Sequence, residues 1–452
     1  MAQKKIKLNF HANSAGTHDQ AWREPYGARD GEFGVEYYLE LARIAERGLF
    51  DGFFLADTVG LYGGRRRQPV FDPLVILTAI STVTERIGLV GSASTTFSEP
   101  YNIARQYSTL DHVSRGRAGW NVVTTYNDNA AANFGLSQLP EKSDRYARAE
   151  EFVDVVRKLW QSWDYDSLHQ PSGFKNGRAL TPPGPIDHQG KFYKVGGPLQ
   201  LPRTPQHAPV IFQAGGSPEG RALAARTAEG VFAMSQTLTE AQEFYEDLKT
   251  RALAFGRREE EVVILPGIYV YIGSTEKEVA EIREGLFATL TPEEHHKELA
   301  SSLHVTVADL PLDKPVPEEV LQHALTVSKR STIKSVIATA REGRPTVREI
   351  LAQRPLAAGH RVLADVPEHI ADSLEEWFAH RAADGFNVGN LTPPKLAEFV
   401  DAVVPILQKR GLYRTEYRGE TLRSHYREDF ETPVSHVGRA PAVSHREHER
   451  VV

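Results

Sequence analysis

Short, largely apolar runs alternate with amphipathic helical segments from the N-terminus to about residue 290. In the segment 34–48, for example, Tyr38, Leu41 and Ala45 recur at helical spacing after the strand-like run 6–10. The strand-like runs are nearly continuous in apolar residues, which is typical of parallel strands covered on both faces. These runs are 6–10, 51–57, 87–95, 118–125, 209–215, 230–235 and 262–273.

Two segments interrupt this alternation. Residues 164–208 are rich in Pro, Gly and polar residues, and residues 290–383 read mainly as helices and loops, so both are predicted insertions. The run 384–389 then supplies an eighth short strand, followed by an amphipathic helix. Eight such units predict a TIM-type (β/α)₈ barrel that forms a single domain over residues 1–427. The remaining residues, 428–452, are polar and lack a periodic apolar face, so we expect an extended C-terminal arm.

An open, doubly wound sheet is the competing architecture. That fold would place a Gly-x-Gly-x-x-Gly turn after the first strand to receive a dinucleotide. The sequence after residue 10 contains no such turn. The pattern therefore favours the barrel.

Composition excludes several classes of function. The formal net charge of -6 argues against a nucleic-acid surface, which needs clustered Lys and Arg. The chain has no cysteine, so disulfides, thiolate nucleophiles and Cys-ligated metals are absent, and redox chemistry requires a bound cofactor. The N-terminus has no apolar signal core and no run of 18 apolar residues follows, so we expect a cytoplasmic protein without a membrane segment.

Candidate chemistry lies at the carboxyl ends of the predicted strands, where barrel enzymes place their reacting groups. The ends carry hydroxyls, an amide and one carboxylate, which suit an uncharged polar ring joined to a phosphate: Asp57, Ser94, Thr95, Thr96, Asn121, Thr124, Thr125 and Ser217. Gly215 and Gly216 allow close approach to the backbone, and the helix that follows offers free N–H groups to an anion. Ser217 is therefore either a plain N-cap or part of a phosphate site.

Other polar residues leave similar alternatives open. Asp57 either caps the turn after its strand or serves the site, and Tyr146 lies either on the surface or in the site. His18, in the loop after the first strand, is the histidine best placed to line a pocket. Neither His-Glu-x-x-His nor a strand-end His-x-His occurs, so no metal site is predicted.

Several longer segments together resemble one known family. They include "AWREP" (21–25), "LARIAERGLFDGFFLAD" (41–57), "STTFSEPYNIARQYSTLDHVSRGRAGWNVVTT" (94–125), "RYARAEEFVDVVRKLW" (145–160) and "VIFQAGGSPEGRALAARTAEGVF" (210–232). The chain resembles the bacterial luciferase superfamily of flavin-dependent monooxygenases over about residues 6–423. Within that superfamily it is similar to the branch with nitrilotriacetate, EDTA, dibenzothiophene-sulfone and pristinamycin monooxygenases.

The resemblance implies a fold, a cofactor and a reaction. It implies a TIM-type barrel that takes reduced FMN (FMNH2) from a separate NAD(P)H-dependent flavin reductase. It further implies that O2 reacts through a C4a-(hydro)peroxyflavin to oxygenate a small organic substrate, with cleavage of a C–S or C–N bond. Homodimers or homotetramers are expected from the same resemblance.

The resemblance also assigns roles to residues. It implies that Asp57, Thr95, Tyr146 and Ser217, together with Gly216, contact the flavin, and that Asn121 lines the pocket. Lys142 stands where relatives commonly carry a histidine; a lysine can meet a phosphate as a point charge but cannot act as a neutral acid or base. His18 and Asn121 are the expected hydrogen-bond donors in catalysis.

Two rival functions remain open on the sequence. A deazaflavin-dependent hydride-transfer oxidoreductase would share the fold, and a non-catalytic flavin-binding protein would share the cofactor site. Spectra after mixing with each reduced cofactor separate the first rival from the monooxygenase. Oxygen-dependent product formation separates the second.

Overall fold

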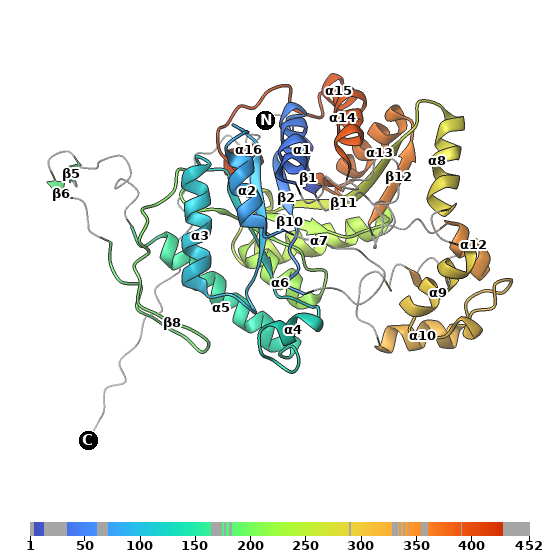
Figure 1. Cartoon of the computed structure of the whole chain (residues 1–452), viewed down its shortest axis with the longest axis horizontal. Coiled ribbons are helices and arrows are strands. Elements are labelled where there is room, and N and C mark those ends of the chain that lie inside the picture. The colour runs from blue at the N-terminus through green and yellow to red at the C-terminus, as the bar shows by residue number, and fades with distance from the viewer. Residues whose placement is uncertain are drawn as a thin grey trace.

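The computed structural model describes most of the chain in defined elements (Figure 1). The described residues are 4–12, 34–60, 71–163, 174–175, 178–179, 183–288, 291–327, 333, 336–337, 340–341, 343–353, 360–389 and 391–427. His18 and the segment 428–452 lie outside the described residues.

Eight parallel strands close into a barrel. Their order around the barrel is β1, β2, β3, β4, β9, β10, β11, β13 and back to β1. This arrangement confirms the predicted TIM-type (β/α)₈ fold, and each predicted strand-like run overlaps one of these strands. The bounds are β1 Lys7–Ala12, β2 Gly52–Leu55, β3 Gly88–Ser94, β4 Ala118–Val123, β9 Val210–Gln213, β10 Gly230–Ala233, β11 Val263–Ile272 and β13 Gly385–Gly389.

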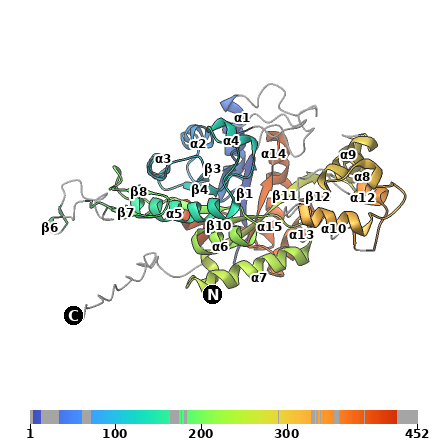
Figure 2. The same cartoon turned by 90° about the horizontal axis from the view of Figure 1, so that it is seen from below.

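Helices surround the barrel on its outside, as Figures 1 and 2 show from two directions. The larger ones follow the strands in βα order, which keeps the connections short. The helices beside the barrel are α1 Val35–Arg47, α2 Pro73–Ser81, α3 Pro100–Val113, α4 Asn129–Asn133, α5 Lys142–Trp160, α6 Pro218–Thr227, α7 Leu238–Ala254, α8 Glu276–Ala288, α13 Pro367–Ala379, α14 Pro393–Ala402, α15 Val404–Lys409 and α16 Leu422–Arg427.

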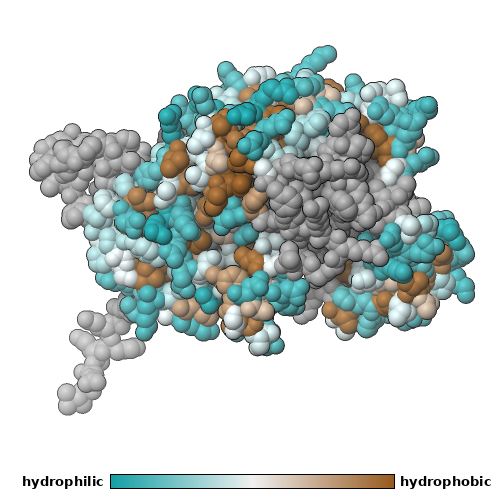
Figure 3. Space-filling view, viewed as in Figure 1, coloured by the Kyte–Doolittle hydropathy of each residue, from teal (hydrophilic) through white to brown (hydrophobic). Residues whose placement is uncertain are grey.

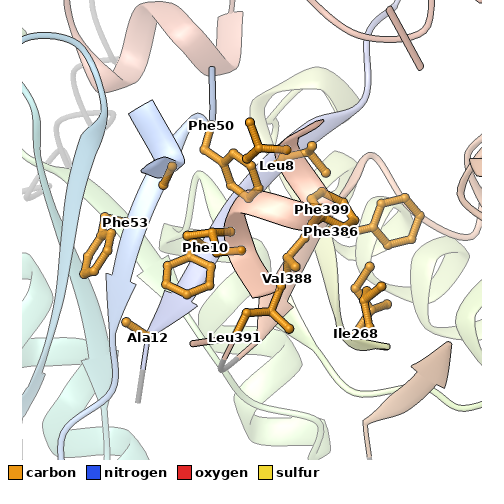
Figure 4. Close-up of a cluster of buried hydrophobic side chains, with 14 of the residues drawn as sticks. Leu8, Phe10, Ala12, Phe50, Phe53, Ile268, Phe386, Val388, Leu391 and Phe399 are labelled. Carbon is orange, nitrogen blue, oxygen red and sulfur yellow. The ribbon is translucent and has the colours of Figure 1, made fainter. Parts of the chain in front are cut away.

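The main core fills the layer between the strands and these helices. Figure 4 shows Phe10 of β1 and Val388 of β13 on the barrel side of this layer and Phe399 on the helix side. The rings of Phe10 and Phe53 lie 5.6 Å apart, and Phe50 meets Phe399 edge-on at 6.1 Å. These residues are fully buried, so each removes a large apolar surface from water.

The barrel interior is sealed at the amino ends of its strands. Leu422 and Tyr426 of α16 join the interior cluster, and the Tyr426 hydroxyl donates to Asn9 Oδ1 at 2.6 Å. Glycines make this possible, because a Cβ at Gly119 would lie 3.0 Å from Leu422 and one at Gly88 would lie closer still. The opposite end, at the carboxyl ends of the strands, is where enzymes with this barrel have their active sites.

Residues 290–383 contain two different kinds of structure. Helices α9 Pro292–Ser302, α10 Glu318–Val327 and α12 Val347–Gln353 contribute to a small apolar cluster of their own. By contrast, β12 Arg361–Asp365 pairs with Ile268–Ile272 in the long strand β11, and α13 joins the main core. The hydrophobic pattern did not predict β12.

The remaining described pieces are short. Two two-stranded hairpins lie in the predicted insertion 164–208, namely β5 Phe174–Lys175 with β6 Arg178–Ala179, and β7 His188–Gln189 with β8 Lys194–Val195. Single 3₁₀ turns cover Glu259–Glu261 and Val307–Asp309. In the described part of the chain, no helix has the length and apolar character needed to cross a membrane.

Candidate active site

A pocket opens at the carboxyl ends of β2, β3 and β4. It is small, with a cavity volume of about 20 Å³, and is partly open to solvent. Its lining combines one carboxylate with hydroxyls, an amide and a few apolar groups: Asp57, Thr58, Val59, Ser94, Val123, Thr125, Tyr126 and Asn127. This lining agrees in character with the polar strand ends that the sequence indicated.

Hydroxyl groups organise the floor of this pocket. Ser94 Oγ and Thr125 Oγ1 lie 2.7 Å apart, and the backbone N–H of Thr96 donates to Ser94 Oγ at 3.1 Å. Thr125 adopts a positive φ of 45°, a conformation that a β-branched residue rarely takes without support. The β3 and β4 ends are therefore tied together in a fixed, strained turn.

Thr95 and Asn121 lie beside this turn, and both are buried. Thr95 donates its backbone N–H to the carbonyl of Val123 at 2.8 Å and its hydroxyl to the same carbonyl at 3.2 Å. Asn121 donates from Nδ2 to Ser92 Oγ at 2.8 Å. Asn121 Oδ1 accepts no hydrogen bond from the described residues, so it remains an acceptor inside the barrel mouth.

Asp57 has an unusual protonation equilibrium. Burial, helped by the nearby negative charge of Asp72, raises the pKa of Asp57 to about 6, and the N–H of Thr58 partly opposes this shift. The carboxyl therefore changes charge near pH 6. Strongly shifted acids in a pocket are often functional groups.

Arg145 connects this pocket to a second cluster. The residue lies on the first turn of α5, and its guanidinium donates to the carbonyl of Thr125 and, at 3.5 Å, to that of Thr124. One turn of α5 thus holds the end of β4. The same turn carries Lys142 and Tyr146 toward α6.

The second cluster is the junction of β9 and α6. Ser217 is the N-cap of α6, and its Oγ accepts the N–H of Gly220 at 3.2 Å; Pro218 follows at the first helical position. Gly216 is exposed beside this cap. A Cβ at Gly215 would lie 2.9 Å from the Cα of Gly220, so the turn packs directly on the helix backbone.

Residues of α5 cover this helix start. Lys142 Nζ donates to Glu219 Oε2 at 2.8 Å, and both side chains are half-exposed. The hydroxyl of Tyr146 lies 3.1 Å from the position of a Cβ at Gly220. The hydrogen bond from Lys142 is the main cause that lowers the pKa of Glu219 to about 2, so this carboxylate stays ionised at neutral pH.

The structure thus gathers the sequence candidates into two connected groups. Asp57, Thr95 and Asn121 lie at the ends of β2 to β4, whereas Lys142, Tyr146, Gly216 and Ser217 surround the start of α6. The candidate role of His18 stays a prediction. Sequence reasoning missed Glu219 as the partner of Lys142 and Asp72 as the neighbour of Asp57.

The two groups fit the two ends of a phosphorylated ring compound. The α6 start offers an N-cap hydroxyl, a glycine turn and a lysine, which suit a phosphate. The pocket at β2 to β4 offers hydroxyls, an amide and one carboxyl, which suit the polar edge of an uncharged ring. Within the described residues, no cluster of His, Asp or Glu has the arrangement of a metal site.

Comparisons with known proteins identify relatives of the chain. The family described as luciferase-like monooxygenases matches residues 10–343. The chain is 41% identical to nitrilotriacetate monooxygenase component A of Aminobacter aminovorans, over 94% of this chain and 96% of that protein.

Solved structures show the same likeness. EDTA monooxygenase from Chelativorans sp. BNC1 matches with a TM-score of 0.78 and 36% identity, over 93% of this chain and 98% of that one. A riboflavin lyase with modified FMN and riboflavin matches with a TM-score of 0.77 and 27% identity, over 94% of this chain and 96% of that one.

Proposed function

Because the chain belongs to the luciferase-like monooxygenase family, we propose that it is the oxygenase component of a two-component, FMN-dependent monooxygenase. A separate NAD(P)H-dependent flavin reductase supplies the reduced FMN. The substrate is a small organic molecule that loses a C–S or C–N bond after oxygenation. The observation that carries the proposal is that one turn of α5 connects the two clusters. Arg145 on this turn donates to the carbonyl of Thr125 in the Asp57 pocket, and Lys142 on the same turn donates to Glu219 at the start of α6.

The protein's own residues bind and orient the cofactor in this proposal. Gly216, Ser217 and Lys142 hold the phosphate at the α6 N-terminus, and Tyr146 covers that end. Asp57 and Thr95 face the ring at the other end. The rigid hydroxyl turn at Ser94 and Thr125 fixes the pocket wall, so the ring has one orientation.

The cofactor brings the redox chemistry and the protein controls its surroundings. When bound, reduced FMN supplies the two electrons with which one oxygen atom of O2 enters the substrate and the other becomes water. Asn121 offers its Oδ1 as an acceptor in the barrel mouth, since its Nδ2 already donates to Ser92, and His18 is proposed as the donor to the reacting groups. Exclusion of bulk water protects the oxidising equivalent from loss as hydrogen peroxide.

Support for a partner comes from the relatives. One relative is named as component A of its enzyme, which implies a second component.

We include self-association into homodimers or homotetramers in the cytoplasm as part of the proposal. Helix α2 supports it, because it contains no charged residue and Val75 on its outer face is 68% exposed. Figure 3 shows an apolar strip over this helix.

Turnover with an added reductase tests the function. Purified protein, FMN, NAD(P)H, O2 and a flavin reductase are mixed with sulfones, sulfonates, thioethers or aminopolycarboxylates. Oxygen-dependent consumption of one class, with incorporation of ¹⁸O from ¹⁸O2 into a product, is the expected result. Binding of FMN without turnover of any class would favour a flavin-binding protein, and spectral binding of reduced deazaflavin alone would favour hydride transfer.

A further inference from the structure

The carboxylate of Glu219 occupies the mouth of the α6 N-terminus. It accepts a hydrogen bond from Lys142 at 2.8 Å, and the hydroxyl of Ser217 and its own backbone N–H also help to lower its pKa. An ammonium, a hydroxyl and a helix-start N–H are the donors that hold a phosphate at such a position. The side chain of Glu219 therefore uses the donors that the proposed function gives to the flavin phosphate.

A buried amide beneath the same turn points to a ligand independently. Gln213 is 2% exposed, and its Oε1 accepts no hydrogen bond from the described residues. A Cβ at Gly215 would lie 2.5 Å from Nε2 of this amide and 3.0 Å from Oε1, so the amide lies directly against the turn. An amide with unused capacity beside an anion site suits a polyol phosphate, which has both hydroxyls and an anionic end.

We propose that the Glu219 carboxylate takes the place of the phosphate at the α6 start when no flavin is bound, and that the phosphate of FMN displaces it. This inference rests on the proposed function. Lys142 then exchanges one anionic partner for another, and Glu219 stays nearby as a repelling charge. The result is weaker, more reversible binding of the phosphate, which allows oxidised FMN to leave for reduction elsewhere.

The negative charge of Glu219 explains why we expect this residue to weaken binding of the FMN phosphate. Glu219 is ionised at neutral pH, and a phosphate monoester carries nearly two negative charges there. Both anions compete for one ammonium and one helix N-terminus, and like charges repel at this distance. Replacing Glu219 by the isosteric glutamine removes the negative charge that competes with the phosphate for Lys142.

Titrations with oxidised FMN and with riboflavin, which lacks the phosphate, test the proposal. We expect Glu219→Gln to lower the Kd for FMN about tenfold, with the gain shrinking at high salt, and to leave riboflavin binding unchanged. Lys142→Met should raise the Kd for FMN. Glu243→Gln, which removes the same charge from the exposed face of α7, is the matched control and should not change either Kd.

The outcomes separate the inference from the function beneath it. Glu219→Gln binding FMN no better than the wild type would overturn the inference while the function stands. An equal gain for riboflavin would also overturn it, because the effect would not pass through the phosphate. Failure of both proteins to bind FMN at micromolar concentration would overturn the inference and the proposed function together.

Discussion

Replacing Asp57 by asparagine should stabilise the fold at neutral pH while weakening flavin binding. The pKa of this carboxyl rises from its ordinary value of 3.8 to about 6, chiefly because of burial. A pKa difference of this size corresponds to about 3 kcal/mol against the ionised form. Because the side chain is partly open to solvent, we discount this to about 1–2 kcal/mol.

The sign follows from the two protonation equilibria of Asp57. Well below pH 3.8 the carboxyl is protonated in both the folded and the unfolded chain, so it adds no cost to folding. Above about pH 6 it is ionised in both, and the folded chain bears the cost of the buried charge. The stability contributed by Asp57 therefore falls as pH rises from about 4 to about 6, and Asp57→Asn abolishes this fall.

Urea unfolding followed by tryptophan fluorescence measures the effect. At pH 8 we expect the free energy of unfolding of Asp57→Asn to exceed that of the wild type by about 1–2 kcal/mol, with the difference shrinking toward zero as the pH falls below about 4. Asp72→Asn is the matched control, since asparagine keeps the N-cap of α2 but removes the neighbouring charge that raises the pKa. Equal stability of Asp57→Asn and wild type at pH 8 would refute the reasoning.

Three further substitutions test other parts of the structure. Ser217→Ala should raise the Kd for FMN several-fold and lower the free energy of unfolding by at most about 1 kcal/mol, because one N-cap bond is lost; FMN titration and urea unfolding check both. Gly220→Ala should lower that free energy by about 1–3 kcal/mol, because its Cβ would lie 2.9 Å from the Cα of Gly215; an unchanged Tm would contradict this. Leu422→Ala should cost about 2–5 kcal/mol by emptying the barrel end, measured by urea unfolding, with unchanged FMN affinity if the active site lies at the opposite end.

The sequence was sufficient to predict the barrel because its strands are buried on both faces. Runs such as 87–95 are apolar almost throughout, and a helical period follows each of them. The sequence pattern did not predict strand β12, because its five residues begin with Arg361, end with Asp365 and are only partly buried. Its pairing with the second half of β11 depends on the length of that strand, which no local pattern in residues 361–365 reports.

The place of the candidate site was predictable, whereas its electrostatics were not. The strand-end rule brought Asp57 and Ser217 to the same end of the barrel without any coordinates. The ion pair of Lys142 with Glu219 joins residues 77 positions apart, so it depends on how α5 packs on α6. The raised pKa of Asp57 similarly needs both its burial and the position of Asp72, which the intervening residues do not specify.

These electrostatics constrain how the flavin can be held. The two cations on the first turn of α5 are already engaged, Arg145 by the carbonyl of Thr125 and Lys142 by Glu219. If FMN binds here as proposed, it draws on neutral donors, such as the α6 backbone and hydroxyl groups, or displaces an existing partner. Under the proposed function, a site with these engagements binds FMN without a large net attraction, which suits a protein that receives reduced flavin and gives back the oxidised form in each turnover. Under the proposed function, the charge balance at the α6 start sets the lifetime of bound FMN, and the ring-end pocket sets the chemistry.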